Sequence, residues 1–539
     1  MNRIKHNRKE FFYQKLVGVY LLLILSGSIF LNSRLFIEYE NTPKEYFVLI
    51  TTIVLMIGCL TSSKLLQLLK QVLLSNFLMS GLSFICLLTS LHGLLQFLEI
   101  IPSHHSAFLI TGTYENPAGF AAVQASLFPF VFVNCFNDEY YNIQRFSMAI
   151  AILCFISVLL SGSRSALLAL CAVVIIVLAF NDTVIAFFKT NGWLLIPLFL
   201  IVVLTSILLY YLKQDSADGR IFIWKRCFEL IKERPFCGYG FWGFHKYYMS
   251  AQADFFRLNP DSQYVMLADC VTHPFNEYIK LIVRFGFLGL LIALLLLIWI
   301  VRLFFKSQYK NKVVGLSFTT SLFVMCQFSY PFSYISVWLL AVFAIIPALL
   351  DSYNGTLLFP RYIRIIVSLF LTIILSITIR KMYFDMKWTE ISKRSIVGQT
   401  DRMLKYYEGM PSSIKRNPLF LYNYAAELNQ SGHHEQSLGL LFQCSEKWND
   451  YDVQLLFSSI YVSLHDKEKA IQSFEMAHFM IPCRFEPLYG EMLVYKEFND
   501  TINALRVADE INEKPIKVRS ERVTFIVESA NKTISLYER

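Results

Sequence analysis

The sequence predicts an all-α membrane protein, a polytopic helix bundle with a large external loop and a helical-repeat domain at its carboxyl-terminal end. Three observations lead to this class. The 539 residues are 55% hydrophobic and only 17% charged, and the mean hydropathy of +0.47 is too high for a soluble chain. Long apolar runs recur as far as residue 380. Beyond that point hydropathy falls, and the pattern becomes that of amphipathic helices.

Apolar runs that can cross about 30 Å of hydrocarbon as helix give the number of expected spans, about eleven. The fifth and sixth are short. The runs lie near 16–31, 46–61, 72–98, 117–136, 147–160, 165–181, 191–211, 278–301, 313–330, 332–350 and 364–380.

Basic residues in short loops predict the orientation, because such loops stay in the cytoplasm. Five lysines and arginines precede the first span, so we expect the amino terminus to be cytoplasmic. With eleven alternating spans, the loop at about 212–276 and the whole region 381–539 then lie outside the cytoplasm. The net charge of +9 is mostly this orientation signal, and we expect no nucleic-acid partner.

The sequence therefore divides into a transmembrane domain, 1–380, and a soluble helical domain, 381–539. Within the second domain, Tyr424 to Leu428 followed by Glu435 aligns with Ile460 to Leu464 followed by Glu468, and a weaker copy follows Pro487. Such a pattern is typical of degenerate tetratricopeptide repeats, in which helix pairs stack to bury their apolar faces. These repeats are a candidate surface for a protein partner.

The cysteines indicate neither a metal nor a cofactor. Most of the eleven lie in or beside apolar runs, where cysteine packs as a small hydrophobe. Cys227, Cys237 and Cys270 share the external loop, and an oxidising compartment would allow one disulfide among them. No spacing of cysteines and histidines is that of a metal site.

The polar segment from Asp215 to His273 interrupts two apolar regions, and we expect function there. It contains Arg220 with Trp224, then the turn Pro235 to Gly240, and it ends in His273-Pro274-Phe275-Asn276 before a helix with Gly286 and Gly289. Two further turns stand at external span ends. These are Gly112 to Pro117, which contains Asn116, and Ser161 to Ala166, which contains Arg164.

In this order, the motifs resemble those of the O-antigen ligase and polymerase superfamily of bacterial membrane glycosyltransferases. The resemblance covers about residues 90–350. One departure is clear, because the family has histidine immediately before the asparagine, whereas this chain has Phe275 there and His273 two residues earlier.

The resemblance implies transfer of a glycan from undecaprenyl pyrophosphate to an acceptor hydroxyl at the outer face of the bacterial inner membrane, without a nucleotide sugar or cofactor. It places the carboxyl-terminal domain in the periplasm. Arg164 and Arg220 would then stabilise the departing pyrophosphate, since guanidinium groups bind phosphate oxygens in pairs. The alternative is that both arginines only reach the membrane interface.

His273 is the candidate general base, because an imidazole exchanges protons near neutrality. It would otherwise cap the next helix or bind phosphate. The substrate-binding candidates are Asn116, Gly238, Gly240, Asn276 and Glu277. The two asparagines also suit the holding of turns, and Glu277 suits the positive end of a helix dipole.

Other functions remain open. The acceptor is a lipid core, a growing glycan or a protein, so a polysaccharide polymerase or a protein oligosaccharyltransferase are alternatives within the enzyme class. A transporter of lipid-linked sugars would carry ionisable residues inside its spans, and few are present. A membrane scaffold would use the repeats but would leave the ordered external motifs unexplained.

Overall fold

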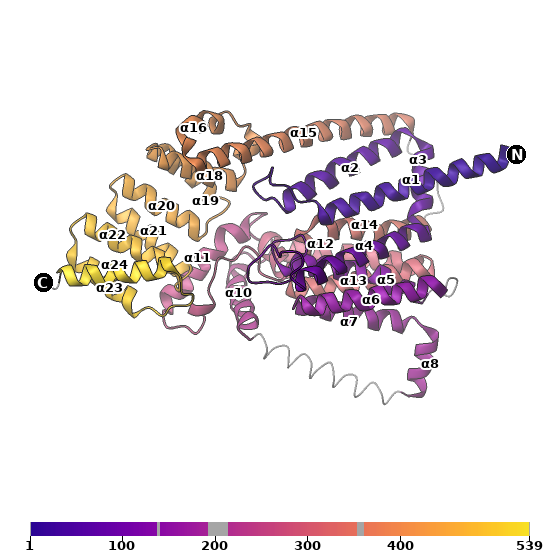
Figure 1. Cartoon of the computed structure of the whole chain (residues 1–539), viewed down its shortest axis with the longest axis horizontal. Coiled ribbons are helices and arrows are strands. Elements are labelled where there is room, and N and C mark those ends of the chain that lie inside the picture. The colour runs from indigo at the N-terminus through magenta and orange to yellow at the C-terminus, as the bar shows by residue number, and fades with distance from the viewer. Residues whose placement is uncertain (1, 137–140, 192–213, 353–359, 538–539) are drawn as a thin grey trace. The chain divides into compact units, whose positions relative to one another are not determined.

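The computed structural model describes residues 2–136, 141–191, 214–352 and 360–537, and regular structure in these ranges is helical throughout (Figure 1). The fold class is confirmed, since eight of the described helices are long and apolar enough to cross a membrane. The expected span at 191–211 lies outside the described residues except for Asn191. The expected spans at 165–181 and 313–330 correspond to helices α7 (Arg164–Ala179) and α13 (Tyr309–Phe328), which are not among those eight.

The described residues form two compact units. The membrane unit takes its residues from Met1–Leu209, Phe275–Glu277 and Ala293–Met386. The loop–tail unit takes its residues from Tyr210–Pro274, Tyr278–Ile292 and Lys387–Arg539. The loop that the sequence separates from the carboxyl-terminal domain thus belongs to the same unit as that domain.

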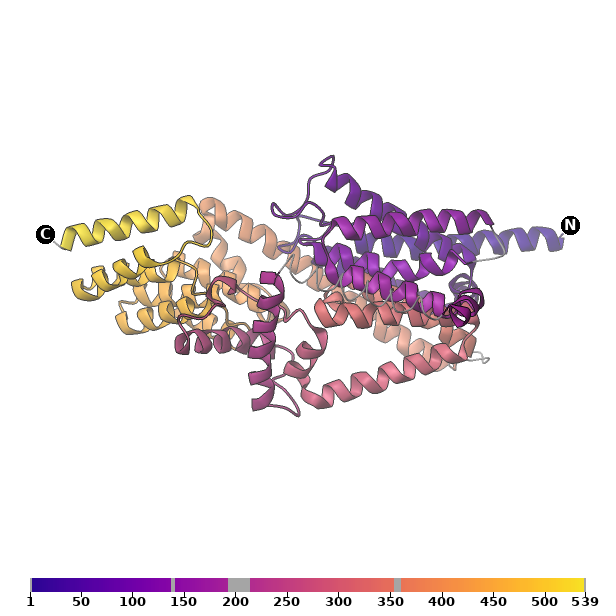
Figure 2. The same cartoon turned by 90° about the horizontal axis from the view of Figure 1, so that it is seen from below.

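Helix α5 (Pro117–Asn134) is the core of the membrane unit, and every residue from Gly119 to Val131 is buried. It begins where Asn116 accepts a hydrogen bond from Ala118 N and Pro117 takes the first helical position, both standard start signals. It contacts α4, α6, α7, α13 and α14, and Figures 1 and 2 show these helices running alongside one another. The other helices of this unit are α1 (Asn2–Phe30), α2 (Asn41–Thr61), α3 (Ser63–Leu73), α4 (Asn76–Phe97), α6 (Tyr141–Leu160), α7 (Arg164–Ala179), α8 (Asp182–Thr190) and α14 (Ile335–Ser352).

Two helices pass from one unit to the other. Helix α12 (Glu277–Lys306) carries a kink at Gly286, and its residues Tyr278–Ile292 belong to the loop–tail unit. Helix α15 (Arg361–Arg394) continues without a break through residue 380, where the sequence places the end of the transmembrane domain. The fall in hydropathy at that point therefore marks a change of environment along one helix and not the end of an element.

The expected external loop is itself largely helical, with α10 (Gln214–Glu233) and α11 (Gly243–Leu258). The carboxyl-terminal region follows as α16 (Thr400–Glu408), α17 (Ser412–Lys415), α18 (Pro418–Gln430), α19 (His434–Ser445), α20 (Tyr451–Ser463), α21 (Lys467–Met480), α22 (Glu486–Glu497), α23 (Thr501–Glu513) and α24 (Glu521–Tyr537). Helices α18 and α19, α20 and α21, and α22 and α23 pack as successive pairs.

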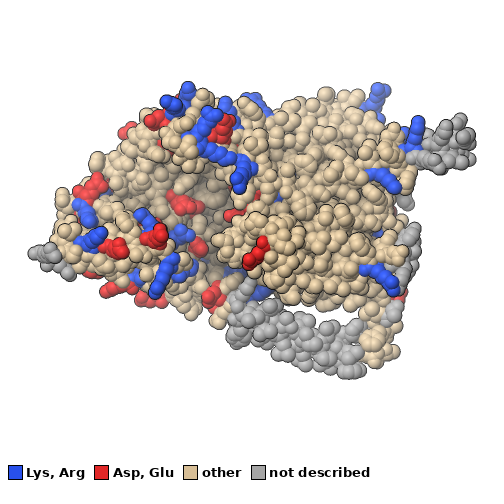
Figure 3. Space-filling model, viewed as in Figure 1, with Lys and Arg blue, Asp and Glu red and all other residues tan. Residues whose placement is uncertain are grey.

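These pairs lie at the positions of the three sequence copies, and three of the helices begin with an aspartate cap. Asp450, Asp466 and Asp500 each precede a helix and accept a hydrogen bond from a backbone N–H of its first turn. That the pairs are tetratricopeptide repeats stays a prediction. On the face shown in Figure 3, charged side chains are dense over the tail helices and sparse over the helices of the membrane unit.

Candidate active site

His273 lies in an extended segment that α10 holds in place. The indole Nε1 of Trp224 donates a hydrogen bond of 2.8 Å to the carbonyl oxygen of Pro274, the residue after His273. Trp224 is one helical turn after Arg220, so the arginine and tryptophan of the motif stand on the same side of α10. Trp224 therefore binds the histidine segment directly, and Arg220 lies on the same side of the helix that carries it.

The turn Pro235 to Gly240 docks on the kink of α12 through backbone hydrogen bonds. Tyr239 N donates to Val283 O at 3.0 Å and Gly240 N donates to Arg284 O at 2.7 Å. In the other direction, Phe287 N and Leu288 N donate to Pro235 O and Phe236 O at 2.8 and 3.2 Å. These bonds satisfy backbone groups that the kink removes from the helical ladder.

Two glycines permit this close approach. A Cβ at Gly238 would stand 2.6 Å from the carbonyl carbon of Arg284, and one at Gly286 would stand 2.1 Å from Phe236 O. Both residues have positive φ, 63° and 64°. Gly238 thus gives close contact with α12, and contact of Gly238 or Gly240 with a substrate stays a prediction.

The turn and the kink fix the part of α12 that carries Lys280 and Arg284, one helical turn apart. Lys280 is only 8% exposed, and the guanidinium of Arg284 lies 4.7 Å from the ring centre of Phe241. Both positive charges act on His273 and on a second histidine, His245 of α11. The two imidazole rings are 6.3 Å apart, edge to face.

Both histidines are neutral at pH 7. Burial is the largest cause that lowers the pKa of His273 to about 3, and Lys280, His245 and Arg284 act in the same direction. Burial also lowers the pKa of His245 to about 4, with further contributions from Arg284 and Lys280. A neutral imidazole can accept a proton, and two adjacent cations can bind an anion, so this cluster combines a base with an anion site.

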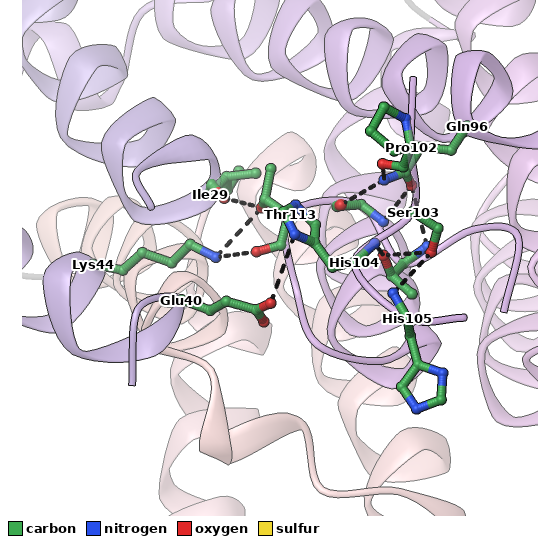
Figure 4. Close-up of polar contacts among 11 residues, drawn as sticks. Ile29, Glu40, Lys44, Gln96, Pro102, Ser103, His104, His105 and Thr113 are labelled. Atoms are coloured by element: carbon green, nitrogen blue, oxygen red, sulfur yellow. Dashed lines mark hydrogen bonds and ion pairs between the residues drawn. The ribbon is translucent and has the colours of Figure 1, made fainter. Parts of the chain in front are cut away.

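In the membrane unit, the turn Gly112 to Pro117 is held by buried polar side chains (Figure 4). Gln96 Oε1 accepts hydrogen bonds from Thr111 N and Gly112 N at 3.1 and 2.7 Å, and its Nε2 donates to Gly112 O at 2.9 Å. Lys44, 1% exposed, donates from Nζ to Thr113 O at 2.7 Å and lies 3.8 Å from the ring centre of Tyr114. These contacts fix the turn.

Asn116, in the same turn, uses its amide for structure. Its Oδ1 caps α5 through Ala118 N at 2.9 Å, and its Nδ2 donates to the hydroxyl of Tyr330 at 3.1 Å. Asn276 similarly donates from Nδ2 to Gln327 O at 3.1 Å, which ties the start of α12 to the end of α13. Their expected contact with substrate stays untested beside these structural contacts.

The remaining sequence candidates lie at helix starts or within α10. Arg164 is the first residue of α7 and Glu277 is the first of α12, whereas Arg220 lies inside α10 and is partly exposed. Arg220, His273, Gly238 and Gly240 belong to the loop–tail unit, and Arg164, Asn116, Asn276 and Glu277 belong to the membrane unit.

Three residues of the cluster were missed from the sequence. Lys280 and Arg284 had a visible signal, because two cations four residues apart at the start of an apolar helix are uncommon unless they serve a site. His245 had none, because its neighbours are distant in the sequence.

Cys227, Cys237 and Cys270 are free thiols in the structure. Within the described ranges, no group of three or more histidine, cysteine, aspartate and glutamate side chains is arranged to hold a metal ion.

Residues 149–294 match the family model of O-antigen ligase. The matched range, about a quarter of the chain, includes Arg164, Arg220, the turn Pro235 to Gly240 and His273 to Gly289. The match supports the resemblance to the O-antigen ligase superfamily and, at the family level, glycan transfer from a lipid-linked donor. No curated protein and no solved structure matches the chain.

Proposed function

We propose that this protein transfers a glycan from undecaprenyl pyrophosphate to an acceptor hydroxyl at the periplasmic face of the bacterial inner membrane. The observation that carries the proposal is the cluster of His273, His245, Lys280 and Arg284, which lies inside the range that matches the O-antigen ligase family. It joins a proton acceptor to the positive charge that a pyrophosphate leaving group requires.

In the proposed reaction, the acceptor oxygen attacks the anomeric carbon of the glycan. As the new C–O bond forms, the hydroxyl proton passes to His273. The bond from the anomeric carbon to the pyrophosphate oxygen breaks, and undecaprenyl pyrophosphate leaves with the bonding electron pair. Lys280 and Arg284, together with Arg220 and Arg164, stabilise the negative charge that grows on the leaving group.

Lys280 and Arg284 contribute to the low pKa of His273. A bound pyrophosphate offsets the charges of Lys280 and Arg284, so it raises the pKa of the histidine and strengthens it as a base. Donor binding would thus activate the residue that deprotonates the acceptor.

Transfer is tested with the purified full-length chain, a defined undecaprenyl-pyrophosphate-linked glycan and three separate acceptors, namely a lipid core, a glycan and a periplasmic protein. Mass spectrometry of the product identifies the acceptor, and release of undecaprenyl pyrophosphate measures turnover. Bound donor without a glycosylated product from any acceptor class would refute the proposal.

The arginines are tested in the same assay. Lysine at position 220 or 164 keeps the charge but loses the paired N–H groups, so we expect transfer to fall by roughly a hundredfold while the protein still inserts. Unchanged transfer in Arg220→Ala would exclude a pyrophosphate role for that residue.

The membrane side is a separate part of the proposal, and the distribution of basic loops supports it. A reporter enzyme that is active only outside the cytoplasm, fused after Lys381, should be active in intact cells. A cytoplasmic reporter active at this position would put the candidate site on the wrong side for a periplasmic reaction.

A further inference from the structure

The turn between α19 and α20 contacts His245 directly. The indole of Trp448 stacks on the His245 imidazole, with ring centres 4.8 Å apart and planes within 12°. The next residue, Asn449, donates from its backbone N to His245 O at 3.1 Å and from Nδ2 to Ser250 Oγ at 3.3 Å. The tail therefore holds both the ring and the main chain of a histidine that faces His273.

Asp450 fixes this turn and links it to the segment before His273. Its Oδ2 accepts a hydrogen bond from Trp448 Nε1 at 2.6 Å and from the thiol of Cys270 at 3.7 Å. Its Oδ1 caps α20 through Val453 N at 3.1 Å. One carboxylate thus sets the orientation of the indole and tethers a residue three positions before His273.

Other tail residues hold the same segment. Cys483 Sγ and Lys517 Nζ donate to Ala268 O at 3.6 and 3.3 Å, and Arg484 pairs with Asp269 at 3.3 Å. Gln252 of α11, 1% exposed, donates from Nε2 to Met480 O at 2.6 Å. Because this amide is buried and hydrogen-bonded, the contact belongs to a packed interface and not to a loose tether.

We propose that the carboxyl-terminal domain is part of the catalytic centre, with Trp448 as a positioning residue that holds His245 beside His273. The inference rests on the glycan transfer proposed above and adds a role for the tail in that reaction. Stacking keeps water from one face of His245 and fixes the ring in one orientation, so the neighbouring His273 has a defined place for the incoming acceptor.

The charged groups around His245 determine how a displacement of its ring would change its pKa. Helix α12 presents Lys280 and Arg284, the extended segment presents His273, and the tail presents Asp450 behind the indole. On α11 itself, Lys246 pairs with Glu446 at 2.6 Å. Because burial is the largest cause of the low pKa of His245, removal of the indole should raise that pKa towards its ordinary value near 6.5.

The test compares Trp448→Ala with Trp388→Ala in the purified full-length protein. Trp388 is a matched control, since it is buried in the same unit and donates at 2.9 Å to Asn423, which lies on α18 and not on α11. For each variant, the turnover number and the KM for the undecaprenyl-pyrophosphate donor are measured from pH 5 to pH 8.

We expect the turnover number of Trp448→Ala to fall at least about tenfold with little change in donor KM. Its rate should also decline as the pH falls below about 6.5, because His245 then gains a proton that it does not hold in the wild type. Trp448→Phe keeps a flat ring and should recover most of the rate. Trp388→Ala should keep the wild-type pH profile, whatever its stability.

Wild-type turnover and pH profile in Trp448→Ala would overturn the inference, as would the same pH shift in Trp388→Ala. If Trp448→Ala does not accumulate, Trp448→Leu keeps apolar volume without a flat ring, and the same loss of turnover is required of it. If the wild type transfers glycan and the Trp448 variants have its turnover and pH profile, only the role of Trp448 is refuted. A wild type that binds donor but transfers no glycan sinks the proposed function and this role with it.

Discussion

Asn116 and Asn276 of the membrane unit and His273 of the loop–tail unit all lie in motifs of the proposed site, but their surroundings differ. Asn116 bonds with both ends of its amide, to Ala118 N and to Tyr330, and Asn276 bonds to a main-chain carbonyl of α13. His273 instead faces a second histidine and two cations. The amides therefore hold helix ends together, whereas we propose that the imidazoles and cations supply the chemistry.

The largest effect should come from His273→Ala. Without the proton acceptor, we expect glycan transfer to fall by at least about a hundredfold, because general bases contribute that much or more. Donor binding should survive, since the cations remain. Transfer and binding of the lipid-linked glycan are measured separately in the same membranes. Loss of donor binding in this variant would reassign His273 to the phosphate.

Removal of one cation should have the next largest effect and should alter the pH profile. In Arg284→Gln, we expect transfer to fall by roughly a hundredfold at pH 7, because one partner of the developing charge is lost. The positive charge of Arg284 lowers the pKa of both histidines, so its loss raises both values. The acid side of the rate profile should therefore begin at a higher pH than in the wild type.

A matched control for this variant is Lys232→Gln, which removes one positive charge from the exposed end of α10. Its rate and pH profile should equal those of the wild type. An equal loss in both variants would mean that overall charge, and not the place of Arg284, governs transfer.

Gly238 and Gly286 allow the turn to pack closely on the part of α12 that carries Lys280 and Arg284. Gly286→Ala and Gly238→Ala would each force a Cβ against main-chain atoms at positive φ, so we expect a loss of roughly 2–4 kcal/mol in the free energy of unfolding. Gly219→Ala in α10 meets nothing within 4 Å and should be neutral or stabilising by about 0.5–1 kcal/mol. Thermal unfolding in detergent ranks the three variants. Equal stability would contradict the close packing of the turn on α12.

The membrane class could be predicted from the sequence because it depends on composition. The orientation and the role of His273 rest on loop charges and a short motif, and they stay predictions. His245 could not, because its stacking partner Trp448 lies about two hundred residues away and only the folded tail brings them together. The fall in hydropathy near 380 predicts a domain boundary but does not reveal that one helix, α15, continues through it. Arg284 was visible in the sequence, but its place beside the histidines depends on the kink at Gly286.

Asn116 should give the smallest effect on the reaction itself, and this tests the structural side of the comparison. Asn116→Ala removes the cap of α5 and the bond to Tyr330, which should cost about 1 kcal/mol or somewhat more in stability. Transfer per folded molecule should stay within about twofold of the wild type, because loss of a cap leaves the charge around His273 unchanged. Asn116→Asp keeps an oxygen for the cap and should recover part of the stability, although it loses the N–H donor to Tyr330.

Both variants are compared by thermal unfolding and by turnover corrected for folded protein. A severe loss of turnover in Asn116→Ala with unchanged stability would reverse the assignment. Asn116 would then bind substrate, as its motif predicts, and the contacts to Ala118 and Tyr330 would serve to aim its amide. If Asn116→Ala instead loses stability and activity in parallel, and Asn116→Asp recovers both, Asn116 has a structural role at the start of α5. The proton transfer and the charge stabilisation then remain with the histidines and cations.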